Sequence, residues 1–283
     1  MASYYTLAGA VRPLDGSVVS PVPLRNRIEA AALAGFDGFG FGYEDLQSTL
    51  EGSSHTEIRK MLDDNGLALC EIEVLQDWFC EGGRRAASDE ARRAMLRDAE
   101  ALGARHIKVG GDLMGGDWPV DLLIEEFARL CDDAREAGTM VCIELFPASN
   151  FSTLEMGRTV VDGAQRSNGG LLLDIWHMTR AGTDFDDIAR LNKSTIIHVE
   201  LNDGPAQQTG PIIPETIDKR VHCGEGEFDI PGFLRSLAVA EYEGPFGVEI
   251  LSDAQRFADT QTAAATAHDH ARAVLSGYPD FST

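Results

Sequence analysis

Four acidic or imidazole side chains interrupt apolar segments in the second half of this sequence. They are Glu144 in VCIELFP, Asp174 in LLLDIWH, His198 in TIIHVELND and Glu249 in FGVEILS. A carboxylate or imidazole is costly to bury without a partner, so a single interruption would carry little information. Four of them, each near the end of a strand-like segment, predict one shared site at one end of a parallel barrel. Three carboxylates and an imidazole form an oxygen-rich ligand set, which predicts a divalent cation.

Short apolar segments that would position these residues recur along the whole chain. Most are apolar on both faces, as the strands of a buried parallel sheet must be. We expect eight strands, at Tyr4–Val11, Phe36–Tyr43, Ala68–Leu75, His106–Gly110, Met140–Phe146, Leu171–Ile175, Ile196–Leu201 and Phe246–Leu251.

Helical patterns alternate with these strands. They are expected at Pro23–Ala34, Ser88–Leu102, Val120–Ala137, Asp229–Glu243 and Thr262–Leu275. Strict alternation over this length predicts an α/β protein, a single-domain (β/α)8 TIM barrel over residues 1–283. A doubly wound open sheet is the rival, but the glycine-rich first turn typical of that fold is missing. The long irregular segment Asn202–Phe228 is expected to be a functional or mobile loop.

Composition narrows the classes of partner. The formal net charge of -22 disfavours nucleic acid, and no apolar run is long enough to cross a membrane. The first residues, MASYYTLAGAV, do not look like a secretory signal. The five cysteines form no CxxC pair, which is typical of a reduced protein, so we expect a cytoplasmic location.

Motifs in the second half carry a resemblance to a known family. Residues 140–252 resemble the xylose isomerase-like TIM barrels, which include ketose 3-epimerases and inosose isomerases and dehydratases. The motifs are a Glu ending the fifth strand, a D-x-x-H pair, a His followed by Asn-Asp-Gly-Pro, an Arg with Gly-x-Gly and Asp, and a final Glu. They correspond to Glu144, Asp174 with His177, His198 with Asn202 and Asp203, Arg220 with Gly224, Gly226 and Asp229, and Glu249.

The resemblance implies a role for each of these residues. Glu144, Asp174, His198 and Glu249 would bind one divalent metal ion, with Mn²⁺ favoured and Mg²⁺, Co²⁺, Zn²⁺ and Fe²⁺ as alternatives. Glu144 and Glu249 would also be the catalytic pair, one removing a proton from the substrate and the other returning one. His177 and Arg220 would hold substrate oxygens.

Other charged residues are weaker candidates for substrate binding. Lys108, near the end of the fourth strand, and Glu73, on the third strand with Glu71, could line the cavity or form structural ion pairs. His222 is a further candidate. Each strong candidate also has a structural alternative: an interior ion pair for Glu144, a cap for Asp174, core packing for His177 and His198, and surface pairing with Asp218 or Glu225 for Arg220.

The resemblance implies a metal-dependent isomerase or epimerase that acts on a small sugar or cyclitol. Proton abstraction next to a carbonyl would give an enediolate. The alternative is a lyase or dehydratase acting on a keto-sugar or keto-inositol, including cleavage of 3-keto glycosides, because elimination begins with the same proton abstraction. A non-catalytic helper subunit and a DNA-repair endonuclease are further alternatives, the latter disfavoured by the acidic composition. Relatives often form dimers or tetramers, so a homo-oligomer stays open.

Overall fold

One parallel sheet forms the centre of the molecule. The computed structural model describes residues 1–279, so the last four residues of the expected domain lie outside the described residues. The strands are hydrogen-bonded in sequence order, each parallel to the next. They are β1 (Gly38–Gly42), β2 (Leu69–Leu75), β3 (His106–Val109), β4 (Met140–Glu144), β5 (Gly169–Asp174), β6 (Ile196–Leu201) and β7 (Phe246–Val248).

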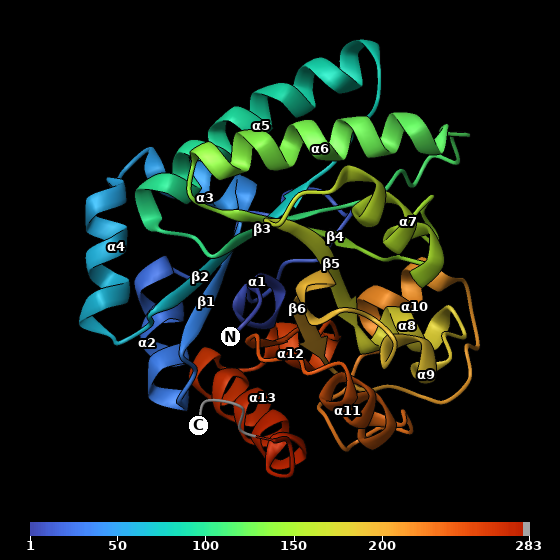
Figure 1. Cartoon of the computed structure of the whole chain (residues 1–283). Coiled ribbons are helices and arrows are strands. Elements are labelled where there is room, and N and C mark those ends of the chain that lie inside the picture. Colours follow the sequence, from blue (N-terminus) through green and yellow to red (C-terminus); the bar gives the residue numbers. More distant parts are fainter. Residues whose placement is uncertain (280–283) are drawn as a thin grey trace.

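Helices surround this sheet (Figure 1). The principal covering helices are α2 (Leu24–Ala34), α4 (His55–Asp64), α5 (Gly82–Leu102), α6 (Val120–Glu136), α7 (Leu154–Ala164), α11 (Ile230–Val239) and α13 (Thr260–Leu275). Shorter helices follow strands or lie in loops: α1 (Tyr4–Leu7), α3 (Tyr43–Leu50), α8 (Ile175–Arg180), α9 (Phe185–Ile188), α10 (Ile212–Asp218) and α12 (Asp253–Phe257). The 3-10 helix η1 (Lys193–Thr195) precedes β6. The prediction of a TIM barrel is therefore confirmed.

The expected first strand is wrong. Residues 4–7 of the predicted strand form the helix α1, and the described residues contain seven strands. A single residue takes the place of the eighth strand, because Ala2 makes parallel bridges to Phe39 of β1 and to Val248 of β7. The apolar run after Ala2 therefore begins with a short helix, which buries Tyr4, Thr6 and Leu7. A short apolar run is compatible with either a strand or a helix.

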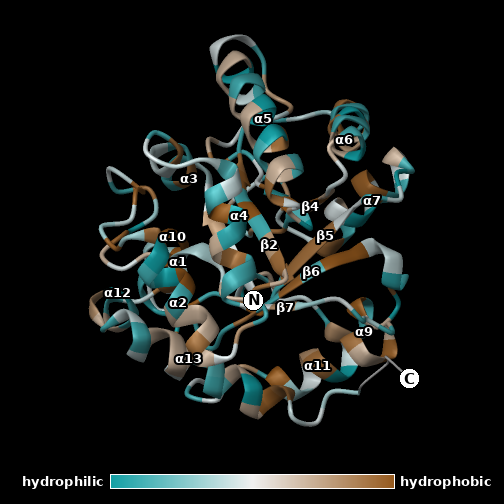
Figure 2. Cartoon of the chain, turned by 90° about the vertical axis from the view of Figure 1, so that its left-hand side faces the viewer, coloured by the Kyte–Doolittle hydropathy of each residue, from teal (hydrophilic) through white to brown (hydrophobic). Residues whose placement is uncertain are grey.

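Apolar burial holds the helices on the sheet. Figure 2 shows the strands in hydrophobic colours, whereas the helices mix hydrophilic and hydrophobic residues, as amphipathic covering helices do. The helix α5 begins at Gly82, earlier than predicted, and Ser88 is not its N-cap: its hydroxyl donates a hydrogen bond to the carbonyl of Gln76. Trp78 and Phe79 are fully buried in the core, and the indole of Trp78 donates to the carbonyl of Gly110.

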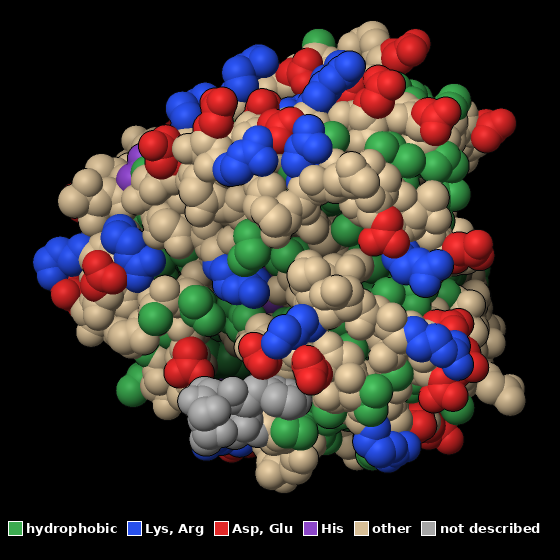
Figure 3. Space-filling view, viewed as in Figure 1, with side chains coloured by type: hydrophobic (Ala, Val, Ile, Leu, Met, Phe, Trp, Pro, Cys, Tyr) green, Lys and Arg blue, Asp and Glu red, His purple; other side chains and the backbone are tan. Residues whose placement is uncertain are grey.

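The surface is charged but not of one sign. Figure 3 shows acidic and basic side chains interspersed over the face seen in Figure 1. Among residues 1–279, no helix combines the length and the apolar character that a membrane crossing requires.

The segment after β6 is folded around one carboxylate. Its path from Asn202 to Phe228 contains α10, so the expected irregular loop is partly helical. The side chain of Asp203 accepts hydrogen bonds from four backbone amides, those of Gly204, Gly224, Gly226 and Phe228, at 2.8–3.0 Å. Asp203 therefore fixes the loop that carries Arg220.

Replacing this carboxylate tests its importance. Asp203→Ala leaves four amides without their acceptor and is expected to lower the free energy of unfolding by about 3 kcal/mol, measured by urea denaturation. Asp184→Ala is the matched control, because its side chain accepts from one amide as the N-cap of α9 and its loss costs about 1 kcal/mol. Equal losses in the two variants would contradict the central role of Asp203.

Candidate metal centre

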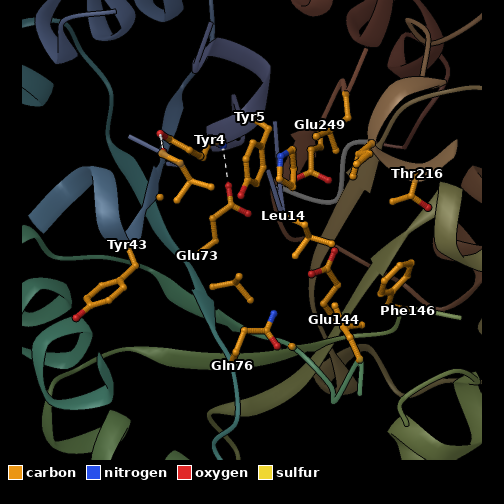
Figure 4. A pocket seen from close by; sticks show the side chains of 18 of the residues that line it. Tyr4, Tyr5, Leu14, Tyr43, Glu73, Gln76, Glu144, Phe146, Thr216 and Glu249 are labelled. Carbon is orange, nitrogen blue, oxygen red and sulfur yellow. Dashed lines mark hydrogen bonds between the residues drawn. The ribbon is translucent and has the colours of Figure 1, made fainter. Parts of the chain in front are cut away.

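A cavity of about 570 Å³ opens where the strands end. Its wall includes residues at or just beyond the carboxyl ends of β1, β2, β4 and β7, which is the end where TIM barrels bind their ligands. Figure 4 shows the side chains of Glu73, Glu144 and Glu249 in this cavity, together with Tyr4 and Tyr5 of α1. Apolar side chains such as Phe146 and Leu251 complete the wall.

Four carboxylates converge next to this cavity: Glu144 and Glu249 line it, whereas Asp174 and Glu200 are fully buried beside them. Each offers one oxygen such that all four oxygens lie within 4.8 Å of one another. Glu144 ends β4, Asp174 ends β5, Glu200 lies in β6, and Glu249 directly follows β7. Asp174 and Glu200 are paired across the two neighbouring strands, which places them at the same height in the sheet.

An arginine and a histidine contact this group. The guanidinium Nη1 of Arg220 lies 2.7 Å from Asp174 Oδ2 and 2.8 Å from Glu249 Oε2. The imidazole Nε2 of His177 lies 3.4 Å from Glu144 Oε1. The other oxygen of Asp174 accepts from the amide of Trp176, so Asp174 is also the cap of α8.

A lysine lies below the four carboxylates, inside the barrel. The ammonium of Lys108 is 2.5 Å from Glu200 Oε1, 2.9 Å from Glu71 Oε1 and 3.0 Å from Glu73 Oε2. Burial alone would lower the pKa of Lys108, but these three carboxylates raise it well above its ordinary value, so the lysine stays charged.

His198 belongs to a different group, at the floor of the barrel. Its Nε2 lies 3.3 Å from Glu71 Oε2, and its ring lies 4.5 Å from the ring of His106. His106 Nε2 is 2.8 Å from the same carboxylate oxygen. Burial lowers the pKa of both imidazoles, so neither adds a positive charge near neutral pH.

The interior holds more carboxyl groups than fixed cations. Six carboxylates (Glu71, Glu73, Glu144, Asp174, Glu200 and Glu249) face two fixed cations, Lys108 and Arg220. Burial, reinforced by neighbouring carboxylates, raises the pKa of Glu200 to about 8 and the pKa of Glu249 well above its ordinary value. A divalent cation would compensate the excess charge and favour the ionised carboxylates.

The donor set fits such a cation. Glu200 is fully buried, and its Oε2 has no hydrogen-bond partner among the described residues. The other three possible ligands, Glu144, Asp174 and Glu249, also offer carboxylate oxygens, which are the ligands that Mg²⁺ and Mn²⁺ prefer.

The structure brings together most, but not all, of the residues selected from the sequence. Glu144, Asp174 and Glu249 share one group, and His177 and Arg220 contact it. The fourth predicted ligand, His198, lies outside this group of four.

Of the weaker candidates for substrate binding, one lines the cavity and two do not. Glu73 lines the cavity, whereas Lys108 is buried beneath it in ion pairs. His222 does not line the cavity: its ring packs 5.2 Å from the ring of His270 on α13.

Sequence reasoning missed Glu200 and the contribution of α1. Glu200 follows His198 by two residues on one strand, so both side chains point to the same face and the pattern alone cannot rank them. Tyr4 and Tyr5 fall in the expected first strand, and the sequence of this segment gives no signal that both line the cavity.

A family model described as xylose isomerase-like TIM barrel matches residues 28–274, and the chain belongs to this family. The 3-dehydroshikimate dehydratase of Pseudomonas aeruginosa is 28% identical over 258 residues, which are 89% of this chain but 39% of that protein. The chain therefore spans less than half the length of this relative.

Two further comparisons concern isomerases and the fold. The inosose isomerase of Halalkalibacterium halodurans is 24% identical over 155 residues, 54% of this chain and 54% of that protein. The solved structure of an IOLI protein with a bound zinc atom has a TM-score of 0.83 and 18% identity, and covers 100% of this chain and 99% of that one. At this identity the likeness concerns the fold.

The central ion-pair cluster gives a stability prediction. Lys108→Met leaves buried carboxylates without their cation and is expected to lower the free energy of unfolding by about 3–5 kcal/mol in urea denaturation with a chelator present. Lys193→Met is the control, because Lys193 is half exposed and pairs with Glu243 at 3.3 Å on the surface, where a pair contributes about 1 kcal/mol or less. A Lys108 variant as stable as the control would show that the cluster is not what holds the barrel interior.

Proposed function

We propose that the chain is a divalent-metal-dependent isomerase or epimerase of a neutral sugar or cyclitol. The observation that carries this proposal is the convergence of four carboxylates beside Arg220 and His177, with Glu144 and Glu249 among the residues that line a cavity of sugar size. Glu144, Asp174 and Glu249 would hold the divalent cation, together with a fourth ligand from β6. When bound, the cation would act as a Lewis acid toward a carbonyl oxygen.

The residues of the chain would move the proton. Glu144 and Glu249 come from opposite parts of the sheet, β4 and the end of β7, and both reach the cavity. A carboxylate on each side of a carbon can remove a proton from one face and return one to the other. Without the cation, burial and neighbouring carboxylates raise the pKa of Glu249, whereas the contact with His177 contributes to a lowered pKa of Glu144. The two carboxyl groups thus differ in their environments, as an acid and base pair requires.

The cavity favours an uncharged substrate. Among its described lining residues, Arg220 is the one lysine or arginine, and it already contacts Asp174 and Glu249. Glu44 and Glu73 add negative charge to the wall. A phosphate or carboxylate on the substrate would therefore meet repulsion without a free cation.

A dehydratase is the second candidate. It is favoured by the similarity to a 3-dehydroshikimate dehydratase across most of this chain. The name of that substrate denotes a carboxylate anion, which the charge of this cavity opposes. Elimination from a neutral keto-sugar or keto-inositol would use the same base and stays the alternative outcome.

Hydrogen exchange tests the proposal. The Mn²⁺-loaded protein is incubated in D₂O with ketoses and inososes, and proton NMR follows the C–H bond next to the carbonyl. Exchange accompanied by formation of an isomeric sugar or cyclitol indicates isomerisation or epimerisation, and formation of a product that has lost water indicates dehydration. Removing the metal with a chelator is expected to abolish either reaction.

Variants of the two bases sharpen this test. Glu144→Gln and Glu249→Gln are each expected to slow exchange by about 10²–10⁴-fold, because an amide cannot transfer the proton. Glu225→Gln, on the surface near His270, is the matched control and should exchange at the wild-type rate. Unchanged exchange in both base variants would refute the assigned roles.

A further inference from the structure

The family resemblance assigns an imidazole from β6 to the metal, but the structure presents a carboxylate there. We propose that the cation site of this chain has four carboxylate ligands, with Glu200 held in place by Ser3 and Lys108, and that this shifts its preference from Zn²⁺ toward Mn²⁺ and Mg²⁺. The inference rests on the proposed metal site and adds the identity of its fourth ligand and its ion selectivity.

Strand register decides which β6 residue reaches the site. Glu200 pairs with Asp174 at the end of β5, whereas His198 pairs with Leu172. Two residues along a strand correspond to about 6.6 Å, so His198 lies one full repeat deeper in the barrel. There it faces Glu71, at 3.3 Å.

One oxygen of Glu200 is anchored and the other is left available. The Ser3 hydroxyl donates to Oε1 at 2.6 Å, and the Lys108 ammonium donates to the same oxygen at 2.5 Å. Oε2 is buried and has no hydrogen-bond partner among the described residues. A buried polar oxygen without a partner is costly, and a cation in the group of four carboxylates would satisfy it.

The neighbouring strand makes room for this arrangement. A Cβ atom at Gly247 of β7 would lie 2.6 Å from His198 Nε2 and 3.0 Å from Glu200 Cγ. Any larger residue at this position would displace one of these two side chains. The absence of a side chain at Gly247 therefore lets His198 stay on the floor while Glu200 occupies the level of the site.

The ligand type sets the selectivity. Imidazole nitrogen favours Zn²⁺ and its neighbours in the transition series, whereas carboxylate oxygen suits Mg²⁺ and Mn²⁺. A fourth carboxylate also adds a negative charge, which Lys108 partly compensates at 2.5 Å. Lys108 and Ser3 are thus positioning residues, since neither belongs to the group of four possible ligands.

Metal titration tests the selectivity without any substrate. The affinities of the metal-free protein for Mn²⁺ and for Zn²⁺ are measured separately by calorimetry at neutral pH, for the wild type and for Glu200→His. The imidazole is expected to raise the ratio of Zn²⁺ to Mn²⁺ affinity by about tenfold or more. An unchanged ratio, with both proteins folded by circular dichroism, would overturn the inference.

A second pair of variants tests the anchoring of Glu200. Ser3→Ala removes one donor to Glu200 and is expected to weaken Mn²⁺ binding by about 10- to 100-fold. Thr139→Ala is the matched control, because the hydroxyl of Thr139, just before the start of β4 and away from the four carboxylates, is also buried but donates to the carbonyl of Ala104. Equal Mn²⁺ affinity in these two variants would count against the anchoring.

The outcomes separate this inference from the proposed function. Failure of the wild type to bind either ion would refute the metal site itself. Tight binding that does not respond to Glu200→His would leave a metal enzyme possible and would remove only Glu200 as its selective ligand.

Discussion

The ammonium group of Lys108, in contact with three glutamates, is the interaction on which the interior of this barrel depends. Glu71, Glu73 and Glu200 come from two strands, and each lies within 3.0 Å of the same nitrogen. In a low-dielectric interior these carboxylates would repel one another strongly, and the cation makes their burial tolerable. With these charges paired, the polar interior is compatible with the hydrophobic contacts that hold the helices on the outside of the sheet.

Lys108 also connects two polar layers with different roles. The floor layer, with His106 and His198 around Glu71, is fully buried and has the character of a packed core. The upper layer, which includes Asp174 and Glu249, meets the cavity. Four of the six interior carboxyl groups lie in this upper layer, and Glu144 and Glu249 line the cavity.

The sequence predicts the alternation of strands and helices well because buried parallel strands leave compact apolar runs. It fails at Tyr4–Val11, where an apolar run is equally compatible with a short helix and where tertiary contacts of Ala2 decide the outcome. It also predicts that Glu144, Asp174 and Glu249 share a site, since each ends or follows a strand. It cannot choose between His198 and Glu200, because the choice depends on the register between β5 and β6.

The segment that closes the barrel also contacts the buried carboxylates. Ala2 bridges the first and last strands. The next two residues donate hydrogen bonds to buried carboxylates: the Ser3 hydroxyl to Glu200, and the Tyr4 amide to Glu73 at 2.9 Å. A site made this way cannot reach its final geometry before the two edges of the sheet are joined. The short segment in the position of an eighth strand makes fewer backbone hydrogen bonds than a full strand would, and it adds contacts to Glu200 and Glu73. These contacts couple the stability of the barrel to the arrangement of its carboxylates.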